Sequence, residues 1–248
     1  MKIIQGQGVS KGIEQGTIYF YHRAAAQVEM RTGADEQEER ARLERAKERT
    51  AQQLSDMAEK AREEAGDEAA VLFETHAMFL EDEDYTGAMD ELLAQGFNAE
   101  YAVDQAGQEF AAMLASMDDP YMQARAADIK DVTGRILNNL MGVVEGGIDS
   151  DVPVILCADD LAPSETIQLD KKKILAIATQ KGSGNSHTAI LARTMGIPAV
   201  CGLGEDFNED FHGKQAYIVG ETGQLILEPD EETLLSLKAR HAKQEETQ

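Results

Sequence analysis

At 248 residues, the chain is long enough for one large domain or two modest ones, and we expect two. Its 46 acidic and 23 basic residues give a formal net charge of -23 at pH 7, which argues against nucleic acid and anionic membrane surfaces as partners. The same charge favours a basic protein partner, because complementary charge speeds and orients association.

No stretch of the sequence has the continuous apolar run of a signal peptide or of a membrane-spanning helix. Cys157 and Cys201 lie in the short apolar runs VILCA and AVCG, a placement typical of free thiols on buried strands in a reducing compartment. We therefore expect a cytoplasmic protein in which these two thiols are not joined.

Residues 1–22 combine β-forming side chains with glycine, which predicts two short strands around a loop. Two short strands are too few for a stable sheet. Further β-forming runs occur late in the chain, at residues 152–157, 173–179, 197–202, 216–220 and 224–229. We expect the opening strands to join the later ones in an α/β layer domain, which makes the segment between them an insertion.

The inserted segment is rich in Glu, Ala, Arg and Gln and has helical periodicity. Its apolar side chains recur at three- and four-residue steps in four stretches, which begin near residues 35, 68, 98 and 120. The last stretch starts at Asp119-Pro120, a capping residue followed by proline at the first helical position. Four helices joined by short links predict a bundle, and residues 231–241 predict one more helix near the end of the chain.

The second helical stretch carries two apolar triplets, Val71-Leu72-Phe73 and Met78-Phe79-Leu80. At about 100° per residue, each triplet spreads over most of the helix circumference. One interpretation is a central helix that contacts two neighbours. The other is an exposed apolar patch that docks a basic protein, because the acidic run Glu81-Asp82-Glu83-Asp84 follows directly.

The stretch GSGNSHTAILARTMGIPAV, residues 182–200, places His187 in the first turn of a predicted helix. The N–H groups of that turn lack intrahelical partners and carry the positive end of the helix dipole, so they stabilise an anionic group near the ring. The same positive end favours the neutral imidazole that a nucleophilic attack requires. The pattern therefore favours a histidine that accepts a phosphoryl group, and the alternative is a structural histidine.

Other reactions fit this stretch less well. Ser186 and His187 are adjacent, so their side chains diverge by about 100° on a helix, which argues against a serine hydrolase. The five histidines and two cysteines lack the spacing of a metal site, and the stretch lacks the lysine of a phosphate-binding P-loop. Arg193 is rotated by about 240° from His187 on the helix and is expected to face away from it.

The segment ADDLAPSETIQL, residues 158–169, is typical of a helix that starts at the end of a strand. Ligands of α/β sheets bind at such strand ends. We expect a hydroxyl from this segment, that of Thr166, to bond one ring nitrogen of His187 and to leave the other nitrogen free to react.

The runs SHTAILAR and GIPAV, together with PSET and ILAIAT before them, resemble the phosphohistidine domain of enzyme I of the bacterial sugar phosphotransferase system, the phosphoenolpyruvate-protein phosphotransferase family. The resemblance extends to FETHAMFLEDED, QARAADIKDVTGRIL and GVSKGIEQGTIYF, and so to nearly the whole chain. It implies an α/β phosphohistidine (swivelling) domain over residues 1–22 plus 144–230. It also implies an inserted all-α helical-bundle subdomain over 33–143 and a linker helix over 231–248.

The resemblance implies roles for individual residues. His187 is the tele-phosphohistidine intermediate, which passes the phosphoryl group of phosphoenolpyruvate to the histidine of the phosphocarrier protein HPr, and Thr166 orients it. We expect the phosphoryl group to be cradled by Gly182, Ser186 and Thr188. The implied HPr-binding residues of the helical insertion are His76, Met78, Phe79, Asp82, Glu83 and Arg125.

Two departures from the family limit what the resemblance implies. Ser183 and Gly184 stand where many members have glycine and arginine, so no role of that arginine is carried over. The full-length family continues into a C-terminal barrel that binds phosphoenolpyruvate and magnesium and forms the dimer, and this sequence stops where the barrel would begin. We interpret the chain as the N-terminal fragment, with no cofactor or metal of its own, which exchanges with phospho-HPr but does not use phosphoenolpyruvate alone.

Two further functions stay open. One is the phosphohistidine domain of a dikinase-type phosphoenolpyruvate-utilising enzyme, although the N-terminal position and the helical insertion favour enzyme I. The other is a non-catalytic helical interaction module that carries an inert α/β domain. An acid-labile, alkali-stable phosphoryl group on His187 would distinguish these classes.

Overall fold

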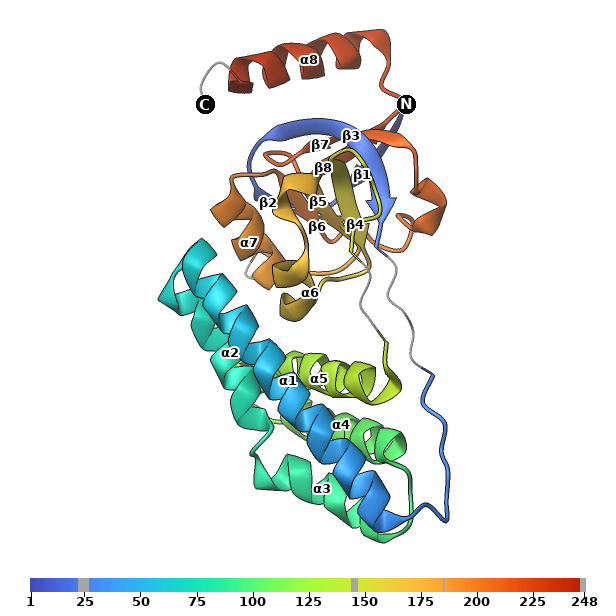
Figure 1. Ribbon diagram of the computed structural model, residues 1–248. Coiled ribbons are helices and arrows are strands. Elements are labelled where there is room, and N and C mark those ends of the chain that lie inside the picture. Colours follow the sequence, from blue (N-terminus) through green and yellow to red (C-terminus); the bar gives the residue numbers. More distant parts are fainter. Residues whose placement is uncertain (22–26, 144–146, 185, 246–248) are drawn as a thin grey trace. The chain divides into compact units, whose positions relative to one another are not determined.

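The computed structural model describes residues 1–21, 27–143, 147–184 and 186–245. The chain divides into two units (Figure 1): an α/β unit formed by residues 1–23 and 146–248, and a helical unit formed by residues 24–145. The predicted fold class, an α/β domain interrupted by a helical bundle, is confirmed. No helix within the described residues is both long enough and apolar enough to cross a membrane.

The described part of the α/β unit contains one eight-stranded sheet. In spatial order its strands are β1 (Lys2–Gln5), β8 (Gln224–Leu227), β7 (Gln215–Val219), β3 (Ile13–Phe20), β4 (Val154–Ala158), β5 (Ile174–Thr179), β6 (Ala199–Cys201) and β2 (Gln7–Ser10). Strands β3 to β6 run parallel to one another, and the other neighbours pair antiparallel. The opening residues therefore pair with late strands, as predicted, but they form three strands where two were expected.

Strands β1 and β2 follow each other in the chain yet lie at opposite ends of the strand order, so the chain crosses from one sheet edge to the other at Gly6. The N–H of Gly6 donates to the carbonyl of Gly223 at 2.7 Å. A Cβ atom on Gly8 would lie 1.9 Å from the carbonyl oxygen of Gly220, so this crossing requires glycine at position 8. The crossing places β2 beside β6, where it contacts the helix α7.

Strand β4 is buried along its whole length, which explains its continuous apolar run. Ile155 and Cys157 point into one apolar cluster with side chains of β3, β7 and β8, whereas Leu156 and Ala158 point into a second cluster on the other face. Ala189 of α7 (His187–Met195) belongs to the second cluster. The apolar face of α7 therefore packs on the sheet.

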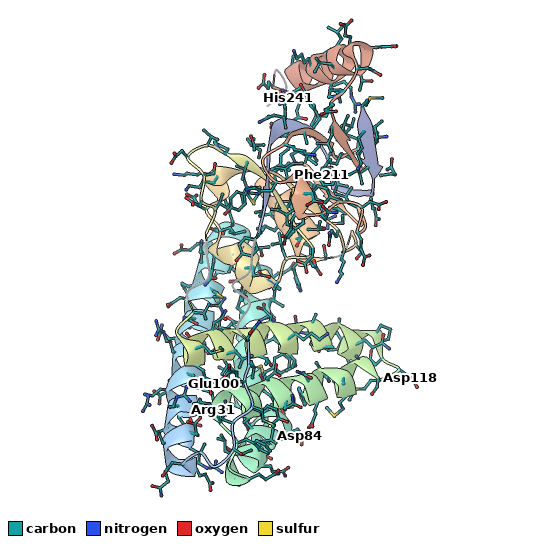
Figure 2. All side chains as sticks on the ribbon, turned by 90° about the vertical axis from the view of Figure 1, so that its right-hand side faces the viewer. Arg31, Asp84, Glu100, Asp118, Phe211 and His241 are labelled. Atoms are coloured by element: carbon teal, nitrogen blue, oxygen red, sulfur yellow. The ribbon has the colours of Figure 1, made fainter. Side chains whose placement is uncertain are left out.

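Two other helices pack in the α/β unit. The short helix α6 (Pro163–Gln168) contacts α7, and α8 (Glu231–Glu245) contacts β3. Leu237 of α8 is buried against β-strand side chains, and Gln244 Oε1 accepts from the N–H of Ile13 at 2.8 Å. His241, which is labelled on α8 in Figure 2, places its Nε2 3.3 Å from Oε2 of Glu14.

The described residues of the helical unit form five helices. These are α1 (Glu36–Ala65), α2 (Asp67–Phe79), α3 (Glu83–Ala94), α4 (Ala99–Ala115) and α5 (Pro120–Met141). The prediction of a single helical stretch between the starts near residues 68 and 98 is wrong, because the chain leaves the helical conformation at Asp82 (φ -67°, ψ 123°). The Asp82 carboxylate accepts from the N–H groups of Asp84 and Tyr85 and so starts α3 as its N-cap.

Polar side chains fix the start of α4. Arg31 and Glu100, both labelled in Figure 2, approach each other to 3.8 Å. The side-chain oxygen of Asn98 accepts from the N–H of Arg31 at 2.8 Å, and Glu39 Oε2 accepts from the N–H of Ala99 at 2.6 Å. The segment before α1 is thereby joined to the start of α4 within the helical unit.

Candidate functional site

His187 is the first residue of α7, and its side chain is exposed. Ser186 adopts the extended conformation of an N-cap (φ -68°, ψ 157°), and its hydroxyl accepts from the N–H of Ala189 at 3.2 Å. The predicted place of His187 in the first helical turn is therefore confirmed. An exposed imidazole at the positive end of a helix dipole can hold an anionic substituent.

The turn before α7 begins where β5 ends and depends on glycine. Gly182 has φ +99°, a conformation that L side chains rarely adopt. A Cβ atom there would lie 3.6 Å from Sγ of Cys201 and from Oγ1 of Thr179, so the turn packs closely on the neighbouring strand. The N–H of Ser186 donates to the carbonyl of Ser183 at 3.0 Å and closes the turn.

Thr188 does not offer its hydroxyl to a phosphoryl group. The side chain is 2% exposed and donates to the carbonyl oxygen of Leu161 at 3.5 Å. The position after His187 is rotated by about 100°, which turns the Thr188 side chain towards the protein interior. The buried hydroxyl leaves the backbone N–H of Thr188, in the first helical turn, as the group that could cradle a phosphoryl group, and that role stays a prediction.

Thr166 lies on α6, is 5% exposed and donates its hydroxyl hydrogen to the carbonyl oxygen of Pro163 at 2.8 Å. A hydroxyl that donates in one direction retains its oxygen as an acceptor. Since α6 packs against α7, the Thr166 oxygen is suited to accept a hydrogen bond from a ring N–H, while its own hydrogen is already donated to Pro163. Its bond to His187 stays a prediction.

His76 is the implied partner-binding residue whose position differs most from expectation. Its ring is completely buried, because it lies on the inner face of α2 three positions after the buried Phe73. The Nε2 atom is 3.2 Å from Oδ1 of Asp128, and Nδ1 is 3.9 Å from Oδ2 of Asp131. The expectation of a surface position for His76 is therefore wrong, and its ring connects α2 to α5.

The other implied docking residues of α2 and α3 lie at or near the surface. Met78 is 71% exposed, Phe79 and Asp82 are half-buried, and Glu83 is exposed. Helix α2 also contacts both α1 and α5. The interpretation of α2 as a helix that contacts two neighbours is therefore confirmed. Val71 and Met78 are exposed on the same helix, and the docking of a partner there stays a prediction.

Arg125 on α5 is half-buried and held by its own helix. Its Nη1 donates to Oδ2 of Asp128 at 3.1 Å, and its Nη2 donates to the hydroxyl oxygen of Tyr121 at 2.8 Å. Asp128 thus lies between Arg125 and His76. Neither Asp128 nor Tyr121 was singled out in the sequence, although the three- and four-residue spacings to Arg125 are those of helical neighbours.

Arg193 was expected to face away from His187, yet its side chain returns to the turn that precedes the histidine. Its Nη2 donates to the carbonyl of Gly184 at 3.0 Å, and its Nη1 donates to the carbonyl of Val9 at 3.1 Å. Rotation about the helix axis alone was a poor guide, because long helical side chains lean towards the N-terminus. Within the described residues, no group of three or more His, Cys, Asp or Glu could hold a metal ion.

Two protein-family models match the chain. One, described as the N-terminal part of phosphoenolpyruvate-utilising enzymes, matches residues 5–125, and the other, described as their mobile domain, matches residues 151–223. Phosphoenolpyruvate-protein phosphotransferases from Priestia megaterium and Lactococcus lactis are 37% and 38% identical to it over 97% and 93% of its length. The chain spans only 42% and 40% of those two relatives.

Solved structures agree with these matches. The solution structure of an Enzyme I protein is 32% identical, superposes with a TM-score of 0.77, and the two chains cover each other to 98% and 99%. The N-terminal domain of a nitrogen-type Enzyme I, at 24% identity and a TM-score of 0.62, shares the fold. The chain belongs to the phosphoenolpyruvate-utilising enzyme family and corresponds to the N-terminal part of its phosphoenolpyruvate-protein phosphotransferases.

Proposed function

We propose that the chain is a phosphoryl relay in which His187 accepts a phosphoryl group that originates from phosphoenolpyruvate and transfers it to the histidine of HPr. The observation that carries the proposal is the exposed imidazole of His187 at the capped N-terminus of α7. The Enzyme I relatives, which match nearly the whole chain, support the same activity.

In the exchange, Nε2 of His187 forms an N–P bond as the N–P bond of the donor histidine breaks. Nδ1 then carries the ring proton, and the hydroxyl oxygen of Thr166 accepts a hydrogen bond from it, which leaves Nε2 facing the phosphorus atom. The backbone N–H groups of the first turn of α7 stabilise the phosphoryl oxygens. Catalysis consists mostly of positioning and of electrostatic stabilisation, as is general for phosphoryl transfer.

The helical unit supplies the partner surface in this proposal. Met78 offers an exposed apolar anchor, and Phe79 lies half-buried beside it. Glu83 and the neighbouring acidic side chains surround this anchor with negative charge, which complements a basic partner. Arg125 provides a cation that can meet an acidic group of HPr.

In this proposal, the part of the relatives that the chain does not match binds phosphoenolpyruvate and magnesium. The same part forms the dimer contact. The described residues offer no ligand group of three for a metal ion. Cys157 and Cys201 are free and buried, which supports a reducing, cytoplasmic location.

The test is incubation of the chain with HPr that carries a ³²P-labelled phosphohistidine. We expect acid-labile, alkali-stable label on the wild-type chain, none on His187→Ala, and wild-type label on His241→Ala, which removes a histidine from α8. Wild-type label on His187→Ala would overturn the assignment of the phosphorylated residue. No label on the wild-type chain would favour a non-catalytic interaction module, and label from phosphoenolpyruvate alone would overturn the assignment of that step to the unmatched part.

A further inference from the structure

We propose that Arg193 is the positioning residue of this site: its guanidinium holds the turn before His187 against strand β2 and so sets the orientation of the reacting imidazole. The inference rests on the proposed phosphoryl exchange at His187. Its basis is the pair of hydrogen bonds from one guanidinium to the carbonyls of Gly184 and Val9.

The geometry follows from the direction of helical side chains. Arg193 lies in the last turn of α7, and its side chain extends back along the helix towards the N-terminus. It reaches the carbonyl of Gly184, nine residues earlier in the chain and two residues before the N-cap Ser186. A single side chain thereby connects both ends of the helix that carries His187.

The second hydrogen bond connects this helix to a distant part of the sequence. Val9 belongs to β2, which is paired with β6 and held at its position by the crossing at Gly6 and Gly8. Strand β2 pairs with β6 on both sides of Val9, at Gly8 and at Ser10, and the Arg193 fork connects the Gly184 carbonyl to this paired strand. Within the turn, the N–H of Ser186 donates to the carbonyl of Ser183 at 3.0 Å.

Charge near the turn agrees with this placement. The Cys201 thiol lies close to Gly182 and contacts the hydroxyls of Thr179 and Ser186. Burial raises the pKa of Cys201, and the nearby positive charge of Arg193 acts in the opposite direction. The guanidinium is thus close enough to interact electrostatically with the Cys201 thiol, in addition to its hydrogen bonds with the two carbonyl groups.

A planar guanidinium suits this task better than an ammonium group. Arginine presents its donors in a fixed fork, whereas lysine is a point charge on a flexible stem. Holding two carbonyl oxygens from separate segments in one geometry requires the fork. A role that needed only positive charge, such as attraction of the phosphoryl group or of the partner, would be served by either residue.

The first test compares exchange kinetics of the 248-residue chain with phospho-HPr for wild type, Arg193→Gln, Arg193→Lys and the control Arg240→Gln, which removes an exposed arginine of α8. We expect kcat to fall about 100-fold in Arg193→Gln, the effect of misplacing a reacting group by about 1 Å. We expect about a tenfold fall in Arg193→Lys, which retains the charge but loses one hydrogen bond. KM for HPr stays unchanged because the implied docking residues belong to the helical unit.

Three kinetic results would overturn the inference: wild-type kcat in Arg193→Gln, full recovery in Arg193→Lys, or a rise in KM with kcat unchanged. The last result would make Arg193 a partner contact. If the wild-type chain accepts no label at all, the proposed function fails, and the second test below still decides the position of Arg193.

The second test needs no phosphoryl donor. Backbone amide NMR signals of residues 182–188 should shift in Arg193→Gln and stay in place in Arg240→Gln, while signals of the helical unit stay in place in both. Unchanged signals of the turn in a folded Arg193→Gln chain would contradict the inference. If Arg193→Gln does not fold, the amide signals of Arg193→Lys are compared with those of Arg240→Gln. Shifted signals of the turn in Arg193→Lys would then support the inference, and unchanged signals would contradict it.

Discussion

The Nε2 atom of His76 lies 3.2 Å from Oδ1 of Asp128, and both side chains are buried. Oδ2 of the same carboxylate accepts from Arg125. A histidine of α2 and an arginine of α5 are thus joined through one carboxylate. His76 therefore connects α2 to α5 inside the bundle, and Met78 and Arg125 are the residues that contact the partner in the proposed function.

Replacement of His76 by alanine should destabilise the helical unit. Asp128 would lose a polar neighbour inside the bundle, and an incompletely paired buried group costs about 2 kcal/mol. Urea unfolding should show this loss for His76→Ala and a change below about 0.5 kcal/mol for His241→Ala on α8. Equal stability of His76→Ala and wild type would mean that the contact with Asp128 contributes nothing.

Replacement of Met78 should affect partner binding without affecting stability. Met78 is 71% exposed, so Met78→Asp removes an apolar anchor and adds like charge to an acidic surface. We expect the affinity for HPr to fall about tenfold or more, as for a central interface residue, with an unchanged melting temperature. Isothermal titration calorimetry measures the affinity.

The matched control for Met78 is Leu235→Asp, since Leu235 is 70% exposed on α8 of the α/β unit. Its HPr affinity should equal that of wild type. An equal loss of affinity in both variants would point to the added charge alone and would argue against a localised docking surface around Met78.

The hydroxyl of Thr166 should matter for transfer. Thr166→Val keeps the volume of this buried side chain but removes the oxygen that is proposed to accept a hydrogen bond from the imidazole, whereas Thr166→Ser keeps the oxygen. We expect about a tenfold slower exchange in Thr166→Val, from the loss of one orienting hydrogen bond, and near wild-type exchange in Thr166→Ser. Rapid-quench kinetics with labelled phospho-HPr gives both rates, and identical rates for the two variants would remove Thr166 from the mechanism.

The helical unit should lose stability in acid through Glu100. Burial alone would raise the pKa of Glu100, but hydrogen bonds from Arg42, from its own backbone N–H and from Asn98 outweigh burial, and the pKa is lowered. A carboxyl whose folded pKa is lowered stabilises the fold above its unfolded pKa and loses that contribution as the pH falls through the folded value. Stability should therefore decline below about pH 4.5, the ordinary value for this group.

The variant Glu100→Gln tests the origin of this acid sensitivity. It should be less stable than wild type at pH 7 and should show a smaller further loss in acid, whereas Glu109→Gln, at an exposed position of α4, should follow the wild-type curve. Urea unfolding at several pH values measures the slope of the unfolding free energy against pH for each variant. A wild-type slope in Glu100→Gln would assign the acid sensitivity to other carboxyl groups.

Local signals in the sequence were sufficient to place His187 at the start of a helix. Ser186 caps α7, Gly196 ends it in the left-handed conformation (φ 67°), and Pro120 follows the cap Asp119 at the start of α5. Caps and periodicity act within a few residues of each other, so the sequence alone determined where these helices begin and which face of α7 is apolar. The continuous apolar run of β4 likewise predicted a buried strand.

Only the tertiary structure decided which distant groups meet. The break before α3, the burial of His76 against Asp128 and the crossing of β1 to β2 across the sheet depend on packing between segments far apart in the chain. The reach of Arg193 to the Gly184 and Val9 carbonyls is of the same kind. Helical periodicity predicts which face of a helix a residue occupies. The partner of a long polar side chain depends instead on which backbone groups the fold places within its reach without another hydrogen bond.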